Sequence, residues 1–220
     1  MTVKKLNKKI LIPICIMAFI SMITIYSALT YTSSELGNLA LKQALWYFIG
    51  ALLVVFLIHM KNEYLYRHTT FLYIFGNILL LGLLLFAEPV NNSKCWFTIP
   101  GIGSIQPSEF MKIFIMLMLA TMIHNFRSDY KNPTLKQEFI FILKTLGIVF
   151  IPSILTFLQP DTGAVIIYFI IYFCMMFASG IRIRWFLIAG GVILLLLGII
   201  FSIFFLQQDL FIDFFGTDLF

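Results

Sequence analysis

Three ionisable side chains of this sequence lie inside, or at the ends of, otherwise apolar stretches: Glu109, Lys112 and Asp161. On insertion scales a charged side chain at the centre of a bilayer costs about 2.5–3.5 kcal/mol, and less near the interface. Such residues usually face a bundle interior or an aqueous cavity, where they mark the path of a substrate. Glu109 and Lys112 are spaced to share one face of a helix. The first interpretation is a polar ligand site. The alternative is structural: an ion pair between Glu109 and Lys112, with Asp161 capping a helix.

The chemistry favoured at such a site is the binding of an anion. Pro107 suits the first position of a helix, because its missing N–H would have no partner there. Asp161 has the side chain of a helix N-cap. Exposed N–H groups at two helix N-termini favour a phosphate or diphosphate. Lys112 would add positive charge, with Lys94 as a further candidate. No Gly-Lys-Ser/Thr follows Gly101-Ile102-Gly103, so a nucleotide P-loop is not indicated.

The composition indicates a polytopic membrane protein. Of the 220 residues 61% are hydrophobic and only 11% are charged, with a mean hydropathy of +1.00. A soluble domain carries about 25% charged residues, so this chain cannot cover itself in water. The formal net charge of +5 would suggest a nucleic-acid partner in a soluble chain. Here it is better explained by membrane topology, and we expect no nucleic-acid partner.

We predict an all-α transmembrane bundle that forms a single membrane domain over residues 1–220. A span needs about 20 apolar residues, because a helix rises about 1.5 Å per residue across a hydrocarbon core of about 30 Å. Seven stretches meet this requirement within a few residues, and they are the predicted helices: 10–31, 39–59, 69–87, 107–124, 139–158, 161–179 and 183–206.

The basic residues alternate between loops and so predict the orientation by the positive-inside rule. The intervening loops hold only Lys42 and Lys94, and the tail after the last helix is acidic. The N-terminus is therefore predicted to be cytoplasmic, and the C-terminus and the 92–106 loop extracytoplasmic. Both polar stretches then approach the outer face. The charges that carry this prediction are Lys4, Lys5, Lys8, Lys9, Lys61, Arg67, Arg127, Lys131, Lys136, Lys144, Arg182 and Arg184 against Asp209, Asp213 and Asp218.

Other reactive side chains have simpler explanations. The three cysteines Cys15, Cys95 and Cys174 lack metal spacing, and the three histidines fall at predicted cytoplasmic helix ends. We expect no metal site and no cofactor. The tryptophans lie near predicted membrane edges and fit an aromatic belt. Trp96 lies inside the polar loop of residues 92–106 and is the one that could instead contact a ligand.

The two polar stretches resemble motifs of the SEDS family, the RodA, FtsW and SpoVE proteins of bacterial elongation, division and sporulation. The family has an Asn-Gly-Ala-x-Arg-Trp loop, then Gln-Pro-Ser-Glu-x-x-Lys at a helix start, and later Gln-Pro-Asp-Leu-Gly-Thr. The matching stretches here are Asn92-Ser93-Lys94-Cys95-Trp96, Gln106-Pro107-Ser108-Glu109-Phe110-Met111-Lys112 and Gln159-Pro160-Asp161-Thr162-Gly163-Ala164. Departures are Cys95 in place of the loop arginine, no glycine after Asn92, and Thr162 and Ala164 in the last motif.

The resemblance implies a peptidoglycan glycosyltransferase that polymerises lipid II, the undecaprenyl-diphosphate-linked substrate, at the outer face of the bacterial cytoplasmic membrane. It also implies a class B penicillin-binding protein as partner, besides membrane lipids. The implied substrate cavity contains Gln106, Ser108, Glu109, Lys112, Gln159 and Asp161, with Lys94 and Trp96 as candidate ligand contacts.

The resemblance covers nearly all of this chain but only the N-terminal part of the family. Family members have about ten helices, and their expected catalytic aspartate lies in an outer loop after helix 7, in a His-Thr-Asp-Phe-type stretch that this chain lacks. The chain is therefore expected to be a fragment or a truncated product, with its catalytic residue unknown. Two alternatives stay open: a flippase for lipid II or another solute, and a non-catalytic scaffold of the cell-wall machinery.

Overall fold

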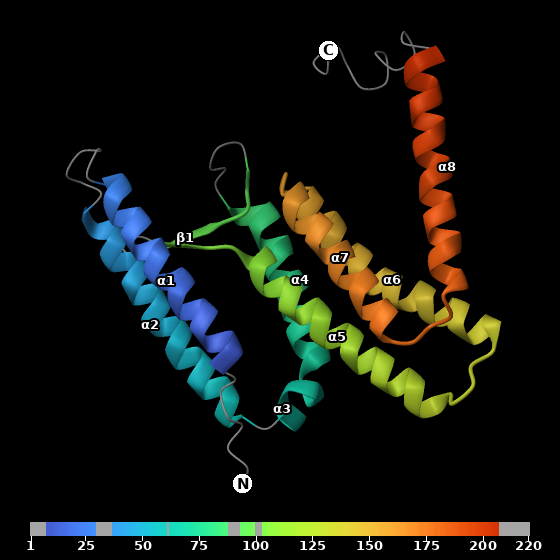
Figure 1. Cartoon of the computed structure of the whole chain (residues 1–220), viewed down its shortest axis with the longest axis horizontal. Coiled ribbons are helices and arrows are strands. Elements are labelled where there is room, and N and C mark those ends of the chain that lie inside the picture. Colours follow the sequence, from blue (N-terminus) through green and yellow to red (C-terminus); the bar gives the residue numbers. More distant parts are fainter. Residues whose placement is uncertain (1–7, 30–36, 61, 88–92, 100–102, 207–220) are drawn as a thin grey trace.

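The computed structural model describes residues 8–29, 37–60, 62–87, 93–99 and 103–206 (Figure 1). Several residues used above lie outside these ranges: Lys4, Lys5, Lys61, Asn92, the loop glycine Gly101, and Asp209, Asp213 and Asp218 of the acidic tail. The end of the first predicted helix, residues 30–31, also lies outside them.

The described part of the chain is almost entirely helical, as predicted. The elements are α1 (Lys8–Leu29), α2 (Gly37–His59), α3 (Asn62–Arg67), α4 (Thr69–Phe86), β1 (Phe97–Ile99), β2 (Gly103–Ile105), α5 (Pro107–Asp129), α6 (Leu135–Phe157), α7 (Thr162–Ala178) and α8 (Arg184–Leu206). Within the described residues, six helices are long and apolar enough to cross a membrane: α1, α2, α4, α5, α6 and α8. The seventh predicted span is α7, whose 17 residues rise about 25 Å.

One short helix and one pair of short strands were not predicted. The short helix α3 lies in the loop before α4, where the sequence suggested only a polar connection. The strands β1 and β2 pair antiparallel, with Thr98 opposite Ser104, so the polar loop contains a small hairpin that was not predicted, within a fold that is an all-α bundle as predicted. Alternating β-formers on both sides of Gly101-Ile102-Gly103 are the signal that this hairpin leaves in the sequence.

A capping box and a proline explain where two of the helices begin. Thr134 and Gln137 form a capping box, in which each side chain bonds the backbone N–H of the other residue. The helix α6 therefore begins at Leu135, four residues before the predicted start at 139. Pro107 occupies the first turn of α5 as expected, and α5 continues to Asp129, beyond the predicted end at 124.

The core lies between α4, α5, α6 and α7, which pack as one bundle. The helices α4 and α5 approach closely at Gly76, where an added Cβ would lie 2.6 Å from Sδ of Met111. The most deeply buried side chains come from all four helices: Leu80, Met111, Ile115, Leu119, Val149 and Tyr168.

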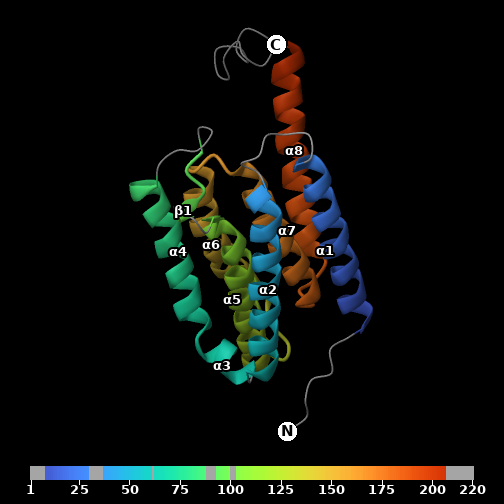
Figure 2. The same ribbon diagram turned by 90° about the vertical axis from the view of Figure 1, so that its left-hand side faces the viewer.

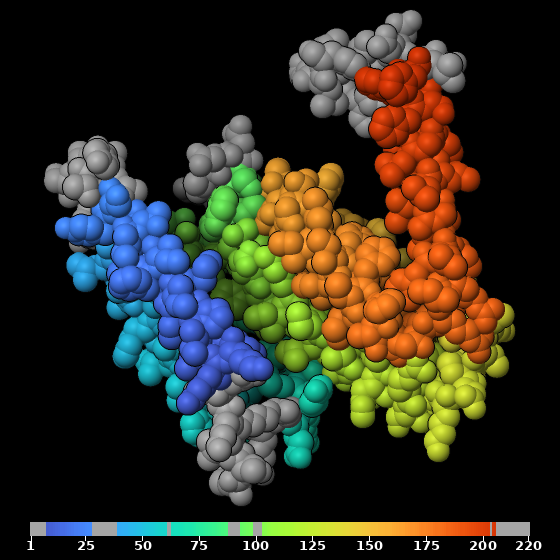
Figure 3. Space-filling model, in the orientation of Figure 1, coloured from blue at the N-terminus to red at the C-terminus, as the bar shows by residue number. Residues whose placement is uncertain are grey.

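The remaining long helices keep their apolar side chains exposed. The pair α1 and α2 stands beside the bundle, and α8 rises away from it on the other side (Figures 1 and 3). No residue in the most apolar stretch of α1, α2 or α8 is buried inside the protein. This is expected for helices that face lipid. In Figure 2 the long helices all run from the upper to the lower part of the view, whereas Figure 1 shows α8 steeply inclined to α5 and α6.

Candidate functional site

The carboxylate of Asp161 joins the starts of α5 and α7. One oxygen, Oδ2, accepts hydrogen bonds from the Gln106 amide at 2.8 Å and from the Ser108 hydroxyl at 3.1 Å. The other oxygen, Oδ1, accepts the backbone N–H of Ala164 at 3.1 Å and so caps α7. Asp161 is thus the anion at the positive end of the α7 dipole, and it fixes the two helix N-termini side by side.

A tyrosine from deeper in the bundle supports this junction. The hydroxyl of Tyr168, on α7, donates to the backbone carbonyl of Ser108 at 3.1 Å and lies 3.4 Å from the hydroxyl of Thr156. The side chains of Tyr168 and Thr156 are completely buried. Ser108 is therefore held from both sides, by Asp161 at its hydroxyl and by Tyr168 at its carbonyl, which makes the first turn of α5 a rigid platform.

Lys112 and Glu109 form an ion pair one turn further along α5. The Lys112 ammonium donates to Oε1 of Glu109 at 2.7 Å. The Lys112 side chain is 19% exposed and that of Glu109 is 57% exposed. An ammonium group has three donors, and the pair uses one of them. A cation held by a partner that is itself half in solvent can exchange that partner for the phosphate of a ligand.

Gln159 holds the polar loop against the bundle. Its amide nitrogen donates to the carbonyl of Leu80 on α4 at 2.8 Å. Its own backbone carbonyl accepts from the hydroxyl of Ser93 at 2.7 Å and from the thiol of Cys95 at 3.0 Å. Gln159 is fully buried, so in this structure it positions the loop and does not line an open cavity.

The thiol of Cys95 is protected at this contact. Cys95 is 2% exposed, and burial raises the pKa of its thiol, with a smaller increase from the negative charge of Asp161, while the hydrogen bond with Ser93 acts in the opposite direction. A thiol at this position stays protonated and donates to Gln159. The residue that departs from the family's arginine is thus a structural hydrogen-bond donor here.

The two candidate ligand contacts lie next to this anchored segment. Lys94 and Trp96 are both half-buried and flank Cys95. The hairpin that follows reaches α2, where Gly103 lies against the indole of Trp46. The polar loop therefore reaches from Trp46 on α2 to Gln159, close in sequence to Asp161.

Analysis of the sequence did not identify one buried ionisable residue. Glu138 lies in the first turn of α6 and is 2% exposed. It accepts a hydrogen bond from the indole of Trp185 at 2.8 Å and lies 3.4 Å from the guanidinium of Arg182. The predicted helix began at residue 139, which assigned Glu138 to the loop; the capping box at Thr134 is the signal that would have placed it correctly.

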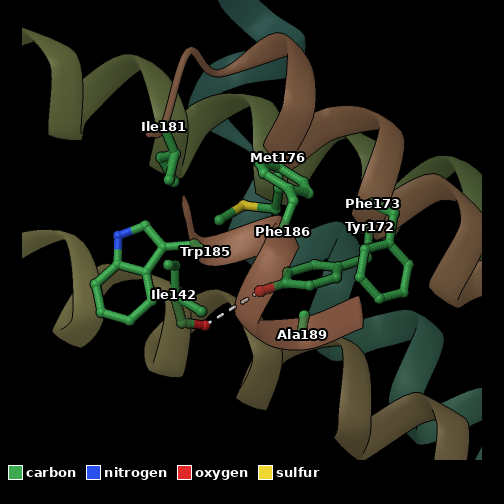
Figure 4. Close-up of a pocket in the computed structure, with 8 residues that line it drawn as sticks. All are labelled: Ile142, Tyr172, Phe173, Met176, Ile181, Trp185, Phe186 and Ala189. Carbon is green, nitrogen blue, oxygen red and sulfur yellow. Dashed lines mark hydrogen bonds between the residues drawn. The ribbon is translucent and has the colours of Figure 1, made fainter. Parts of the chain in front are cut away.

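A cavity of about 60 Å³ lies beside Trp185, between α6, α7 and the start of α8 (Figure 4). The Tyr172 hydroxyl in its wall donates to the carbonyl of Ile142 at 3.3 Å, and the Trp185 indole is bonded to Glu138. The rest of the lining is apolar, and it contains none of the predicted site residues. Among the described residues, no group of three His, Cys, Asp or Glu side chains could hold a metal ion.

Comparison with known proteins matches residues 8–216 to a family model described as cell cycle protein, FtsW, RodA and SpoVE. A probable peptidoglycan glycosyltransferase FtsW of Lactococcus lactis is 27% identical, over 91% of this chain and 52% of the relative. The peptidoglycan glycosyltransferase RodA of Treponema pallidum is 33% identical, over 80% of this chain and 39% of the relative. The chain spans about half, or less, of the length of these relatives.

Two solved structures have a similar fold. A crystal structure of a mutant of the rod shape determining protein RodA from Thermus thermophilus superposes with a TM-score of 0.67 at 20% identity, covering 86% of this chain and 59% of that one. A second, titled as the structural coordination of polymerization and crosslinking by a peptidoglycan synthase complex, gives a TM-score of 0.63 at 20% identity, covering 90% of this chain and 57% of that one.

Proposed function

This chain belongs to the FtsW, RodA and SpoVE family of cell cycle proteins, and we propose that it forms the lipid-diphosphate-binding region of a peptidoglycan glycosyltransferase. It is a multi-pass protein of the bacterial cytoplasmic membrane. The proposed substrate is lipid II, whose disaccharide is carried on undecaprenyl diphosphate. Several relatives bear the name peptidoglycan glycosyltransferase, which supports the reaction class.

The observation that carries the proposal is the position of Lys112 beside a fixed junction of two helix starts. Asp161, Gln106 and Ser108 bind one another, and their hydrogen bonds lock the first turns of α5 and α7. Lys112 then lies one turn into α5, partly exposed, with donors to spare. A lysine buried in hydrocarbon without a ligand would be costly, whereas one at the edge of a polar platform suits a diphosphate.

In this proposal the residues divide into two groups. Lys112 contacts the diphosphate directly, and Glu109 holds its ammonium in place until the ligand arrives. Gln106, Ser108 and Asp161 are positioning residues, since their side chains bond one another. Gln159 positions the loop through its amide nitrogen and its backbone carbonyl, while its Oε1 has no hydrogen-bond partner in the described structure. Lys94 and Trp96, on the anchored loop, extend the contact toward the ligand's polar head.

The cluster is proposed to bind and orient substrate, not to transfer protons. The oxygens of Asp161 already accept three hydrogen bonds, and Glu109 is paired with Lys112. General-base activation of an acceptor sugar hydroxyl needs a carboxylate free to reach that hydroxyl. Asp161 does not meet that requirement in this structure, and Glu109 is held by Lys112 through Oε1.

A partner is part of the proposal. One structural neighbour is a complex that, by its title, coordinates polymerization with crosslinking. We therefore propose that this chain works beside a class B penicillin-binding protein, which would crosslink the glycan. The exposed apolar surfaces of α1, α2 and α8 leave room for a partner's membrane helix as well as for lipid.

The test is reconstitution of a full-length relative with its partner in liposomes that contain fluorescent lipid II, with the substitution made at the lysine that matches Lys112. Glycan chains that lengthen with time, and that stop with Lys112→Gln, would support the proposal. Movement of lipid II between leaflets without lengthening would favour a flippase instead. Retained binding of the partner, with neither polymer nor transport, would favour a scaffold. Polymer formed at the normal rate by the Lys112 variant would overturn the assignment.

A further inference from the structure

A second cavity lies at the opposite end of α5 and α6 from the Asp161 junction. It has a volume of about 130 Å³ and is lined by Phe126, Tyr130, Gln137, Ile140, Phe141 and Lys144. This volume is many times the roughly 10–15 Å³ that one water molecule needs. Its lining residues come from the end of α5 and the start of α6, and Figure 1 shows these two helix ends at the lower right.

Helical spacing builds this cavity from two short stripes. On α6, Gln137, Ile140, Phe141 and Lys144 recur at intervals of three and four residues, which puts them on one face. The partner stripe on α5 begins at Phe126. The rings of Phe126 and Phe141 stack with their centroids 4.1 Å apart and form a contact between the two helices. The ring of Tyr130 lies against that of Phe126, with a centroid distance of 5.4 Å.

Lys144 brings an uncompensated positive charge to the cavity. Within the described part of the chain it makes no hydrogen bond and no ion pair. It lies nine residues into α6, about 14 Å along the axis, so its ammonium must reach back toward the membrane surface past the cavity. The acid in the same turn region, Glu138, is directed away to Arg182 and Trp185.

The other polar atoms at the cavity also suit an anion. Tyr130 contributes a hydroxyl and Gln137 an amide; the Gln137 carbonyl oxygen is used in the capping box, which leaves its NH₂ group to donate. Lys131, Lys136 and Asp129 lie nearby, but all three are exposed and stand outside the lining. The site therefore combines donors and positive charge with aromatic and aliphatic walls.

We propose that this cavity binds the headgroup of an anionic phospholipid in the cytoplasmic leaflet. The phosphate would contact Lys144, with Gln137 and Tyr130 as further donors, and the acyl chains would follow the exposed apolar side chains of α6 such as Ile140 and Leu143. Amphipathic walls favour a lipid over a free anion, because inorganic phosphate gains nothing from Phe126 or Ile140. The leaflet follows from the basic residues of the α5–α6 loop.

The experiment measures the melting temperature of the purified full chain in an uncharged detergent, with phosphatidylglycerol, phosphatidylcholine or inorganic phosphate added. The variants are Lys144→Gln, which removes the charge, and Ile140→Trp, which fills the cavity without changing charge. Lys136→Gln is the matched control, because it makes the same charge change on the same helix outside the cavity lining. Melting of each variant without added lipid checks that it folds.

We expect phosphatidylglycerol to stabilise the unmodified chain and Lys136→Gln alike, at lower concentration than phosphatidylcholine does. Its apparent affinity should fall at least fivefold in both Lys144→Gln and Ile140→Trp. Equal losses in Lys136→Gln and Lys144→Gln would overturn the site in favour of diffuse surface charge. Full stabilisation by inorganic phosphate alone, or unaltered lipid affinity in Ile140→Trp, would also overturn it.

Discussion

The Asp161 carboxylate and the Gln106 amide, 55 residues apart in sequence, are joined by a hydrogen bond of 2.8 Å. This bond connects the cap of α7 to the residue immediately before α5. With the second bond, from Ser108 to the same oxygen, it makes the relative position of two helix starts depend on one side chain. Every proposed function of the polar cluster depends on that geometry.

Asp161→Ala should therefore destabilise the protein strongly. It removes an N-cap, worth about 1 kcal/mol, and two hydrogen bonds to a charged acceptor, each worth about 1.5–3 kcal/mol. We expect a loss of roughly 3 kcal/mol or more, seen as a lower melting temperature in detergent. Asp161→Asn keeps a capping oxygen and should lose clearly less. Equal melting temperatures for Asp161→Ala and the unmodified protein would show that the junction does not stabilise the fold.

Gly76→Ala should destabilise the packing of α4 on α5. The new methyl group would lie 2.6 Å from Sδ of Met111 and 2.7 Å from the ring of Phe114, and overpacking of this kind costs about 1–3 kcal/mol. Gly147→Ala is the matched control, because a Cβ there meets no atom within 4 Å and alanine favours the helix. Thermal melting should therefore move in opposite directions for the two variants. A stabilised Gly76→Ala would contradict the close approach.

The Glu138 contact should show strong coupling with Arg182. Arg182→Ala leaves a buried carboxylate without its cation; because the arginine is 41% exposed and Trp185 still donates to Glu138, we expect a loss of about 1–3 kcal/mol. Adding Glu138→Gln to that variant removes the unpaired charge and should recover part of the loss. Trp185 fluorescence reports the same site, because its indole donates to Glu138. Additive effects of the two substitutions would mean that the ion pair contributes little.

Cys95 should give the protein a stability that declines in alkaline solution. Burial raises the pKa of this thiol in the folded chain, so the folded state keeps its proton when the unfolded chain begins to lose it. The contribution of Cys95 to the free energy of unfolding is fully present below the pKa of the thiol in the unfolded chain, about 8.5. That contribution is lost as the pH rises above this value. Cys95→Ala should remove this component of the pH dependence. Alkylation of Cys95 as fast as that of an unfolded cysteine at pH 8 would contradict its burial.

The sequence predicted the membrane-spanning helices well, but it did not predict the contacts between them. Apolar length located all the long helices, because each must satisfy its backbone inside the bilayer. It did not predict that Asp161 binds Gln106 and Ser108, since spacing within one helix says nothing about contacts between helices. Nor did it predict Glu138, which the capping box places inside α6, or that Gln159 is buried, since a polar side chain in a loop is normally exposed.

The most direct test of the central proposal is the affinity of the purified chain for lipid II, compared between the unmodified protein, Lys112→Gln and the matched control Lys136→Gln. A lost charge-assisted contact of about 1.5–3 kcal/mol corresponds to a loss of affinity of roughly ten- to a hundredfold. We predict that loss for Lys112→Gln alone, with unchanged membrane insertion. Equal affinity in all three proteins would contradict the proposal that Lys112 binds the lipid diphosphate.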